Sequence, residues 1–315
     1  MRHSNIQPKP LFERRMKNLI QDYENWLEWS KKNSPNTIRC NTLKITPENL
    51  KEKLNNRGWE IEQPYKSNPE IMRIISDLQP GELGKTQEHL LGYYYVQDIS
   101  SMMPPIALQP APQELVLDLT AAPGSKTTQM SMLMENSGTI LANDKILDRI
   151  KILVSNLERC GCTNALVTRH DAVQLCIKLQ KLGMKFDKIL LDLSCSGEGT
   201  IRSSPKTFLI WNPKMIIKLS KMQKKIASTA IPLLKDGGSL IYSTCTHAPE
   251  ENEGVVDFLI KNFDMKIEKL DLPLKSRPGL TEWGGKKYSP ELKNAARIYH
   301  HDNDTEGFFL ARLRK

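Results

Sequence analysis

Apolar residues in the first quarter of the chain follow periods that predict a small α+β unit. Over Phe12–Trp29 they recur every three or four positions, which predicts an amphipathic helix. Residues 38–43 have the composition of a strand, and Thr46-Pro47 is an N-cap followed by proline at the first helical position. A further strand is expected from Gly58. We expect this unit to cover residues 1–85, with a second domain over residues 86–315.

From residue 115 the pattern changes to short apolar runs that alternate with helical segments. Strands are predicted over residues 115–119, 139–144, 165–168, 188–193 and 239–243, with a helix over 146–159 and a turn at Asp236-Gly237-Gly238. The run Thr305 to Arg314 is expected to form a closing strand. Alternation of this kind predicts an α/β fold with a mainly parallel sheet and helices on both faces.

Chemically active side chains fall at or just past the predicted strand ends. They are Asp118, Asp144, Asp171, Asp192 and Cys245. Parallel α/β sheets bind their ligands at the carboxyl ends of the strands. The sequence therefore predicts one ligand site along this edge.

The segment Ala121-Ala122-Pro123-Gly124-Ser125-Lys126 joins the first of these strands to the next helix. Glycine permits close approach of backbone to a ligand, and helix N-terminal amides favour anionic groups. The spacing is not that of a P-loop. An acidic residue at the end of the next strand, here Asp144, commonly holds a ribose hydroxyl. Arg149 is expected to pair with a carboxylate, and Asp171 either to accept from an adenine amino group or to cap a helix.

Two cysteines stand on the expected ligand side. Cys195 lies in a glycine-containing turn three residues after Asp192, and Cys245 directly follows the predicted strand 239–243 and Thr244. A lone cysteine is usually structural, but two at strand ends with a nearby carboxylate indicate thiol chemistry. The thiolate is the nucleophile, and Lys126 or a positive pocket could lower the thiol pKa. The residues alone leave open which cysteine attacks.

The other cysteines are interpreted as structural: Cys40, Cys160, Cys162 and Cys176. Cys160-Gly161-Cys162 lacks the second ligand pair of a zinc site, so no metal is assigned. Six cysteines in 315 residues do not indicate a disulfide framework. The N-terminus is too polar for a secretory signal, and no apolar run approaches the roughly 18 residues that span a membrane. We therefore expect a cytoplasmic monomer with no membrane partner.

The net charge of +9 favours an anionic partner, nucleic acid first. Basic residues concentrate in residues 201–225, which contain no acidic residue. This segment is either the solvated face of a helix or a wall that contacts phosphates. Its basic residues are Arg202, Lys206, Lys214, Lys218, Lys221, Lys224 and Lys225.

Taken together, the motifs resemble those of the Sun family of RNA (cytosine-5) methyltransferases, in its archaeal form without an appended RNA-binding module. The resemblance covers nearly the whole chain. Its marks are Arg39-Cys-Asn-Thr-Leu43, Tyr95-Val-Gln-Asp-Ile-Ser-Ser101, Asp118 to Thr127, Asn143-Asp144 with Arg149, His170-Asp171-Ala172, Asp192-Leu-Ser-Cys-Ser-Gly197, Tyr242-Ser-Thr-Cys245, Glu250-Glu-Asn-Glu253 and Thr305-Glu-Gly-Phe-Phe309.

The resemblance implies a class I, Rossmann-like methyltransferase fold with a seven-stranded sheet, and S-adenosylmethionine as cofactor. The loop Ala121–Lys126 would hold its methionine part, Asp144 its ribose with Arg149 nearby, and Asp171 its adenine. Cys245 would attack carbon 6 of cytosine, and Cys195 would assist loss of the carbon 5 proton and release of the enzyme. Asp192, held by Lys126, would lie between the cofactor and the base and contact both, with transfer RNA as the expected substrate.

Three positions depart from the family pattern. Ser194 stands where the family usually has proline, which would rigidify the turn that presents Cys195. Thr120 and Ser125 stand where cysteine and glycine are common. None of these changes removes a reactive group.

Three alternatives stay open. They are a ribosomal RNA cytosine methyltransferase, a DNA cytosine methyltransferase in which Cys195 attacks, and a non-catalytic RNA-binding assembly factor. For RNA contact, the candidates are the N-terminal unit and the segment 201–225. Stacking of bases is considered for Trp29 and Trp59, whereas Phe12, Trp26, Phe308 and Phe309 are expected to pack in the interior.

Overall fold

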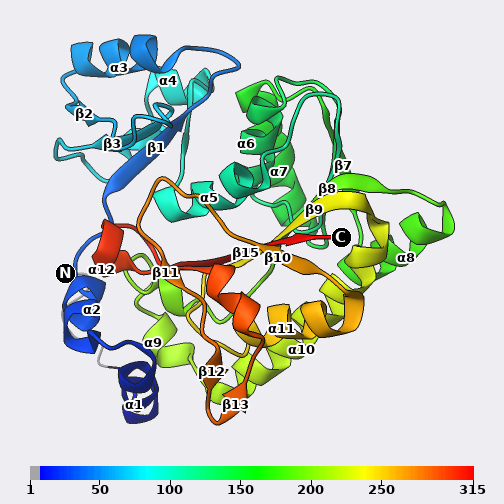
Figure 1. The fold of residues 1–315 in the computed structure, drawn as a ribbon. Helices are drawn as coiled ribbons and strands as arrows, with labels where there is room; N and C mark the ends of the chain where they lie inside the picture. The colour runs from blue at the N-terminus through cyan, green and yellow to red at the C-terminus, as the bar shows by residue number, and fades with distance from the viewer. Residues whose placement is uncertain (1–7) are drawn as a thin grey trace. The chain divides into compact units, whose positions relative to one another are not determined.

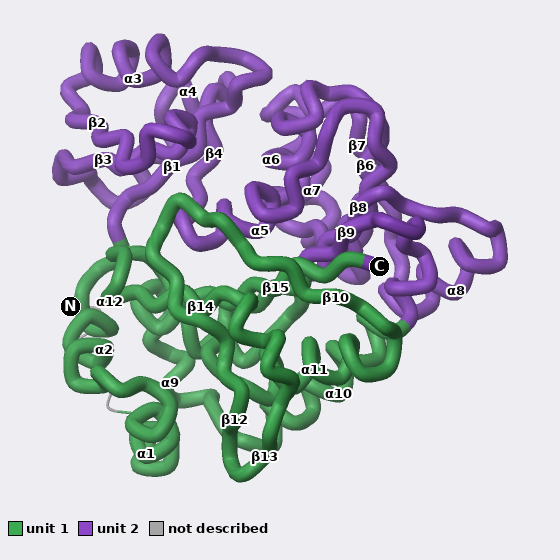
Figure 2. Tube along the Cα trace, viewed as in Figure 1, with its two compact units in different colours: residues 1–34, 193–228, 242–314 green, residues 35–192, 229–241, 315 purple. Residues whose placement is uncertain are grey.

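The computed structural model describes residues 8–315, which divide into two compact units (Figure 2). Unit 1 contains residues 8–34, 193–228 and 242–314, and unit 2 contains residues 35–192, 229–241 and 315. Within the described range, every helix is too short or too polar to cross a bilayer. The predicted boundary at residue 85 stays a prediction.

Unit 2 begins with a small antiparallel sheet in the order β2-β3-β1-β4. Thr46 accepts a hydrogen bond from the Asn49 amide at 3.3 Å and caps α3, as the sequence predicts. Trp59 packs in the interior and donates to Glu82, so the expectation that it stacks on bases is wrong. The elements are β1 (Asn36–Cys40), α3 (Pro47–Asn56), β2 (Ile61–Glu62), β3 (Ile71–Ile74), α4 (Gln87–Leu90) and β4 (Tyr94–Val96).

The rest of unit 2 is the predicted parallel sheet (Figure 1). Its strands run in the order β9-β8-β5-β6-β7, and β5 pairs in parallel with both β6 and β8. Asp118, Asp144 and Asp192 are the last residues of β5, β6 and β8. The elements are α5 (Ile99–Leu108), β5 (Leu115–Asp118), α6 (Ser125–Leu133), β6 (Thr139–Asp144), α7 (Leu147–Cys160), β7 (Ala165–Arg169), α8 (Ala172–Lys181), β8 (Phe186–Asp192) and β9 (Leu234–Thr244).

Asp236-Gly237-Gly238 does not precede the strand as predicted but lies inside β9. Gly237 has φ +76°, a left-handed conformation that glycine adopts without strain. Its amide donates to the carbonyl of Lys315 at 3.1 Å. The strand therefore continues through a local irregularity whose sequence is typical of a turn.

Unit 1 contains the first described residues and most of the C-terminal segment, residues 242–314. The single predicted helix over residues 12–29 is two helices, because Ile20, Gln21 and Asp22 interrupt it. Phe12 and Trp26 are fully buried, as expected, and pack with residues from three distant segments: Ile201, Phe208, Trp211, Ile216, Ala248 and Tyr299. The helices of unit 1 are α1 (Pro10–Leu19), α2 (Tyr23–Ser30), α9 (Thr207–Ile210), α10 (Pro213–Ala230, shared at its end with unit 2), α11 (Glu253–Phe263) and α12 (His300–Asn303).

The C-terminal run forms the predicted strand, β15 (Phe308–Arg314), which pairs antiparallel with β10 (Lys266–Glu268) and β14 (Ala296–Ile298). Phe308 and Phe309 are buried, as expected. The α/β fold class is confirmed. Over the described residues the sheet order links nine strands rather than seven, because β10 and the short β11 (Arg277–Pro278) join it. A separate hairpin is formed by β12 (Glu282–Trp283) and β13 (Lys286–Lys287).

Candidate active site

In unit 2, Lys126 and Asp192 form an ion pair at the carboxyl end of the sheet. The Lys126 Nζ lies 2.7 Å from Asp192 Oδ2 and donates to Ser101 Oγ at 3.0 Å. Lys126 is buried in the first turn of α6, and the Asp192 carbonyl accepts from Thr120 Oγ1 at 2.7 Å. The expected contact between Lys126 and Asp192 is therefore present. Ser101 is a further member of the site, to which the sequence motif 95–101 assigned no role.

Asp144 and Arg149 adjoin the glycine-containing loop. Arg149 Nη1 lies 3.1 Å from Asp144 Oδ2, so the expected pairing with a carboxylate is confirmed, and Arg149 Nη2 also donates to the Ala122 carbonyl. Asp144 is buried, and its Oδ1 accepts from the Ile146 amide at 3.0 Å. Among the described residues its Oδ2 makes no hydrogen bond, although it is buried. That oxygen can accept from a hydroxyl group of a ligand.

The loop reaches α6 through Gly124, which has φ +105°. Gly124 has no side chain with which to cap this helix end, and the first amides of a helix lack intrahelical acceptors. Behind the loop, Asp118 accepts from Thr127 at 2.7 Å, and burial raises the pKa of Asp118 to about 7. The arrangement suits a ligand that carries its own anionic group.

Asp171 caps α8, one of its two predicted roles. Its Oδ1 accepts from the Val173 and Gln174 amides, and its Oδ2 lies 3.1 Å from Lys145 Nζ. The hydrogen bond from Lys145 lowers the pKa of Asp171. Contact with an adenine stays a prediction.

Arg39 of β1 reaches the same loop, although the sequence alone gave it no role. Its guanidinium is buried, donates to the Ser125 carbonyl and to Thr128 Oγ1, each at 2.8 Å, and also contacts Gln97. Burial lowers the pKa of Arg39 to about 10. The only feature of the sequence that could have drawn attention to Arg39 was its position in the family motif 39–43. Arg39 fixes the first turn of α6, where Lys126 stands.

In unit 1, the two cysteines singled out from the sequence are neighbours. Their sulfur atoms lie 3.2 Å apart, a hydrogen-bonding contact in which either can donate. That hydrogen bond, and then burial, raises the pKa of Cys195 well above that of a free thiol. Both side chains keep partial exposure. The four other cysteines are placed elsewhere, and burial raises the pKa of each: Cys40, Cys160, Cys162 and Cys176.

Buried polar groups surround the cysteine pair. Ser196 Oγ lies 2.7 Å from Thr246 Oγ1, and the Gly199 amide donates to the Cys245 carbonyl at 2.9 Å. Glu251 and Gln223 also contact the turn around Cys195 and are fully buried. Neither was predicted from the sequence. Glu251 lies in the family motif 250–253, whereas nothing in the sequence around Gln223 marks it.

We expect Gly199→Ala to destabilise the protein. A Cβ at position 199 would lie closer than 3.0 Å to the carbonyl oxygens of Gly307 and Cys245, and backbone atoms cannot move aside cheaply. Overpacking of this kind costs about 1–3 kcal/mol. Urea unfolding measures it, with Gly84→Ala as the control, because an added Cβ there meets no atom within 4 Å. Equal midpoints for the two variants would contradict the expectation.

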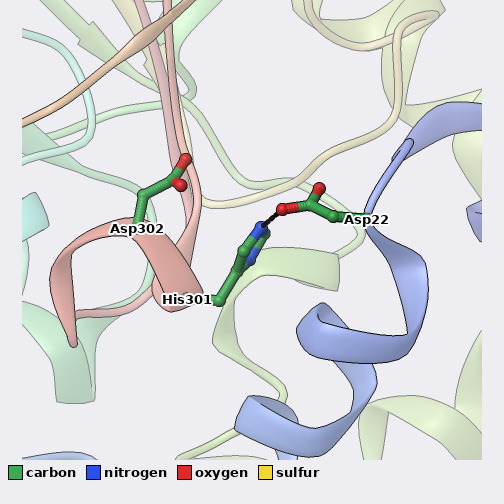
Figure 3. Close-up of side chains that lie close together, drawn as sticks. All are labelled: Asp22, His301 and Asp302. Atoms are coloured by element: carbon green, nitrogen blue, oxygen red, sulfur yellow. Dashed lines mark hydrogen bonds and ion pairs between the residues drawn. The ribbon is translucent and has the colours of Figure 1, made fainter.

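A group of possible metal ligands in unit 1 is formed by Asp22, His301 and Asp302 (Figure 3). His301 Nε2 lies 2.8 Å from Asp22 Oδ2. Arg277 donates to both carboxylates, at 2.7 to 2.9 Å, and so supplies the positive charge between them. The cluster is therefore explained as an ion-pair network.

The basic segment 201–225 is only partly available to RNA. Arg202 is buried and donates to the carbonyls of Asn33 and Thr305 and to Asp304, so the expectation that it contacts phosphates is wrong. Lys224 is half-buried over the Phe258 ring. The other lysines are exposed, and those of α10 recur at helical spacing on one face: Lys214, Lys218, Lys221 and Lys225.

Comparison with known proteins gives two family matches. Residues 105–314 match the family described as "16S rRNA methyltransferase RsmB/F", and residues 8–99 match the "N-terminal domain of 16S rRNA methyltransferase RsmF". A curated relative from Pyrococcus abyssi (strain GE5 / Orsay), "tRNA (cytosine(49)-C(5))-methyltransferase", is 42% identical over 98% of this chain and 96% of its own length. The chain spans only 36 to 60% of seven other curated relatives.

Three solved structures cover 98% of the chain, and two of them match it over 96% or more of their own length. "Methyltransferase Homolog Protein from Pyrococcus Horikoshii" has a TM-score of 0.87 and 35% identity, over 96% of its own length. "NSun6 from Pyrococcus horikoshii with SFG" has a TM-score of 0.82 and 27% identity, over 98% of its own length.

Proposed function

Because this chain belongs to the RsmB/F family of RNA methyltransferases, we propose that it methylates carbon 5 of cytosine in transfer RNA, with S-adenosylmethionine as methyl donor. The observation that carries the reaction is the contact of Cys195 and Cys245 at 3.2 Å. Transfer RNA is favoured because the relative of matching length acts there by its name. The protein would work in the cytoplasm as a monomer, without a metal.

The residues of unit 2 fit the proposed donor. The Asp144 carboxylate, held by its ion pair with Arg149 at 3.1 Å, would accept a hydrogen bond from a ribose hydroxyl. The amides that follow Gly124 would receive the carboxylate of the methionine part, since Gly124 itself has no side chain to cap α6. Asp171 would contact the adenine. S-adenosylmethionine supplies an electrophilic methyl group when bound.

Cys245 is proposed as the nucleophile toward carbon 6 of cytosine. Its thiolate would donate an electron pair to carbon 6, and the ring electrons would move to carbon 5, which becomes nucleophilic. Once sulfur is bonded to carbon, the negative charge beside Cys195 is gone. The hydrogen bond that raises the pKa of Cys195 is then removed, so Cys195 can ionise more easily. After carbon 5 has bonded to the methyl group, the thiolate of Cys195 could take the proton from carbon 5. The electron pair of that C–H bond would re-form the double bond between carbons 5 and 6, and Cys245 would leave as a thiolate.

Asp192 and Lys126 are proposed to hold the base. The Asp192 carboxylate would accept a hydrogen bond from the base edge, and the positive charge of Lys126 would stabilise the negative charge that develops on the ring during attack. Lys126 fixes that carboxylate at 2.7 Å and is itself fixed by Ser101. Asp192 is the last residue of β8 and precedes Cys195 by three residues in the chain.

We expect neutralisation of Lys218, Lys221 and Lys225 to glutamine to weaken RNA binding and its salt dependence. These exposed lysines share one face of α10. For each phosphate that is no longer neutralised, the magnitude of the negative slope of log affinity against log salt should fall by roughly 0.7–0.9. The three substitutions together should therefore reduce it by roughly two to three. Filter binding over a salt series measures the slope. Neutralising Lys151, Lys178 and Lys181 of unit 2 is the control, and an unchanged slope in the first variant would place the RNA contact elsewhere.

The proposed function is tested by transfer of labelled methyl from S-adenosylmethionine to unmodified transfer RNA transcripts, with bisulfite sequencing of the product. A single cytosine that resists bisulfite conversion after the reaction would support the proposed function. Methyl transfer to ribosomal RNA but not to transfer RNA would show that the substrate is ribosomal RNA, as in the family description. Transfer to DNA would favour the DNA enzyme, and RNA binding without transfer would favour a non-catalytic assembly factor.

A further inference from the structure

The turn that carries Cys195 is held on both sides by two buried side chains. Gln223 Nε2 donates to the Ser194 carbonyl at 3.0 Å and to Glu251 Oε2 at 2.9 Å. The Ser196 amide donates to the Glu251 carboxylate at 3.2 and 3.3 Å. Gln223 and Glu251 are both 0% exposed. They therefore fix the peptide groups before and after Cys195, although Ser194 lacks the rigidity of a proline.

The same contacts make the surroundings of the two sulfurs unequal. Two thiolates 3.2 Å apart would repel each other strongly, so when the pair loses one proton, the other proton stays between the two sulfurs. Glu251 adds a carboxylate next to the amide that follows Cys195. A negative charge on that side favours the neutral form of Cys195.

We propose that Glu251, oriented by Gln223, is a positioning residue that keeps the shared proton on Cys195 and so leaves Cys245 as the thiolate. The consequence for catalysis rests on the proposed function, in which Cys245 attacks cytosine. The location of the proton does not depend on the proposed function, because it is a property of the protein in the absence of RNA and methyl donor.

The proposal carries a pH dependence. Burial raises the pKa of Glu251 to about 7, and the titratable groups that interact with it are Glu198, Arg15 and the neutral thiol of Cys195. The carboxylate gains its charge as the pH rises through about 7. The preference for the thiolate at Cys245 should therefore increase over that range.

The test is limited alkylation of the full-length protein with iodoacetamide, which reacts with thiolates, followed by mass spectrometry of the peptides that contain Cys195 and Cys245. In the unmodified sequence, Cys245 should react faster, and the ratio of the two rates should rise between about pH 6 and 8. Glu251→Gln should lower that ratio by about threefold to tenfold at pH 8 and flatten its pH profile, since one pKa unit is tenfold in thiolate fraction.

Glu250→Gln is the matched control. It removes the same charge one position earlier, where the carboxylate contacts Arg15 and Trp283 rather than Ser196. Its ratio should stay near that of the unmodified sequence. An equal response of the two variants, or none in Glu251→Gln, overturns the proposal.

A second variant covers the case in which Glu251→Gln fails to fold. Gln223→Met keeps the carboxylate and removes the hydrogen bonds that orient it, so it should also lower the ratio, by about twofold or more. An unchanged ratio there overturns the proposal. Selective alkylation of Cys245 in a protein that transfers no methyl group would leave this inference standing and refute the proposed function. Methyl transfer by a protein whose two cysteines are alkylated at equal rates would support the proposed function and refute this inference.

Discussion

Cys245→Ala should abolish both methyl transfer and the covalent protein–RNA adduct. Without the thiolate, nothing adds to carbon 6, and carbon 5 stays too weak a nucleophile to accept a methyl group. The loss in turnover should be roughly a thousandfold or more, as is usual when a catalytic nucleophile is removed. Labelled methyl transfer measures turnover, and denaturing gels with fluorocytosine-containing RNA measure the adduct, because fluorine at carbon 5 cannot leave as a proton does.

The matched control for this experiment is Cys176→Ala. Cys176 is a buried cysteine of α8 in unit 2, so its replacement tests whether loss of any thiol affects the reaction. Cys176→Ala should retain transfer and adduct. Full activity in Cys245→Ala would refute the assignment of the nucleophile.

Cys195→Ala should have the second largest effect, and of a different kind. Attack by Cys245 and methylation should proceed, whereas removal of the carbon 5 proton should slow. A stable adduct with ordinary cytosine-containing RNA should therefore accumulate to about one equivalent, visible as a shifted band on a denaturing gel. Multiple-turnover methylation should fall by roughly a hundredfold or more, since general-base assistance contributes about 10²–10⁴-fold.

The double variant with Cys195 and Cys245 both replaced by alanine is the control for that adduct and should form none. The reverse pattern, with an adduct in Cys245→Ala and none in Cys195→Ala, would exchange the two roles. It would also bring the protein closer to the DNA enzymes considered as an alternative, in which the first cysteine attacks.

The sequence predicted the strand ends well because each depends on local features. Asp118, Asp144 and Asp192 follow apolar runs of strand length, and all three are the last residues of their strands. The contact of Cys195 with Cys245 could be anticipated because both follow predicted strands of one sheet, although the residues alone did not assign their roles.

What the sequence could not predict are contacts that depend on long-range packing. Gln223 is one of many polar residues in α10, and nothing in the sequence distinguishes it from the others. Its hydrogen bond to the Ser194 carbonyl joins residues 29 positions apart in the chain and forms only when α10 packs beside that turn. Arg202 looked like the other basic residues of its segment, but three backbone carbonyls and Asp304 enclose it. Local composition does not distinguish an exposed lysine from a buried arginine of this kind.

The interior of unit 1 has a consequence for how the chain acquires its structure during synthesis. Helices α1 and α2 are made first, yet Trp26 packs against Tyr299 in the same core, and its carbonyl lies 2.8 Å from His300 Nε2. These partners leave the ribosome much later, near the end of the chain. The apolar faces of α1 and α2 therefore stay exposed until residues 299 and 300 have been synthesised. Residues 35–192 of unit 2 can pack among themselves before then. A nascent chain stalled before residue 299 should be the form most exposed to chaperones and proteases.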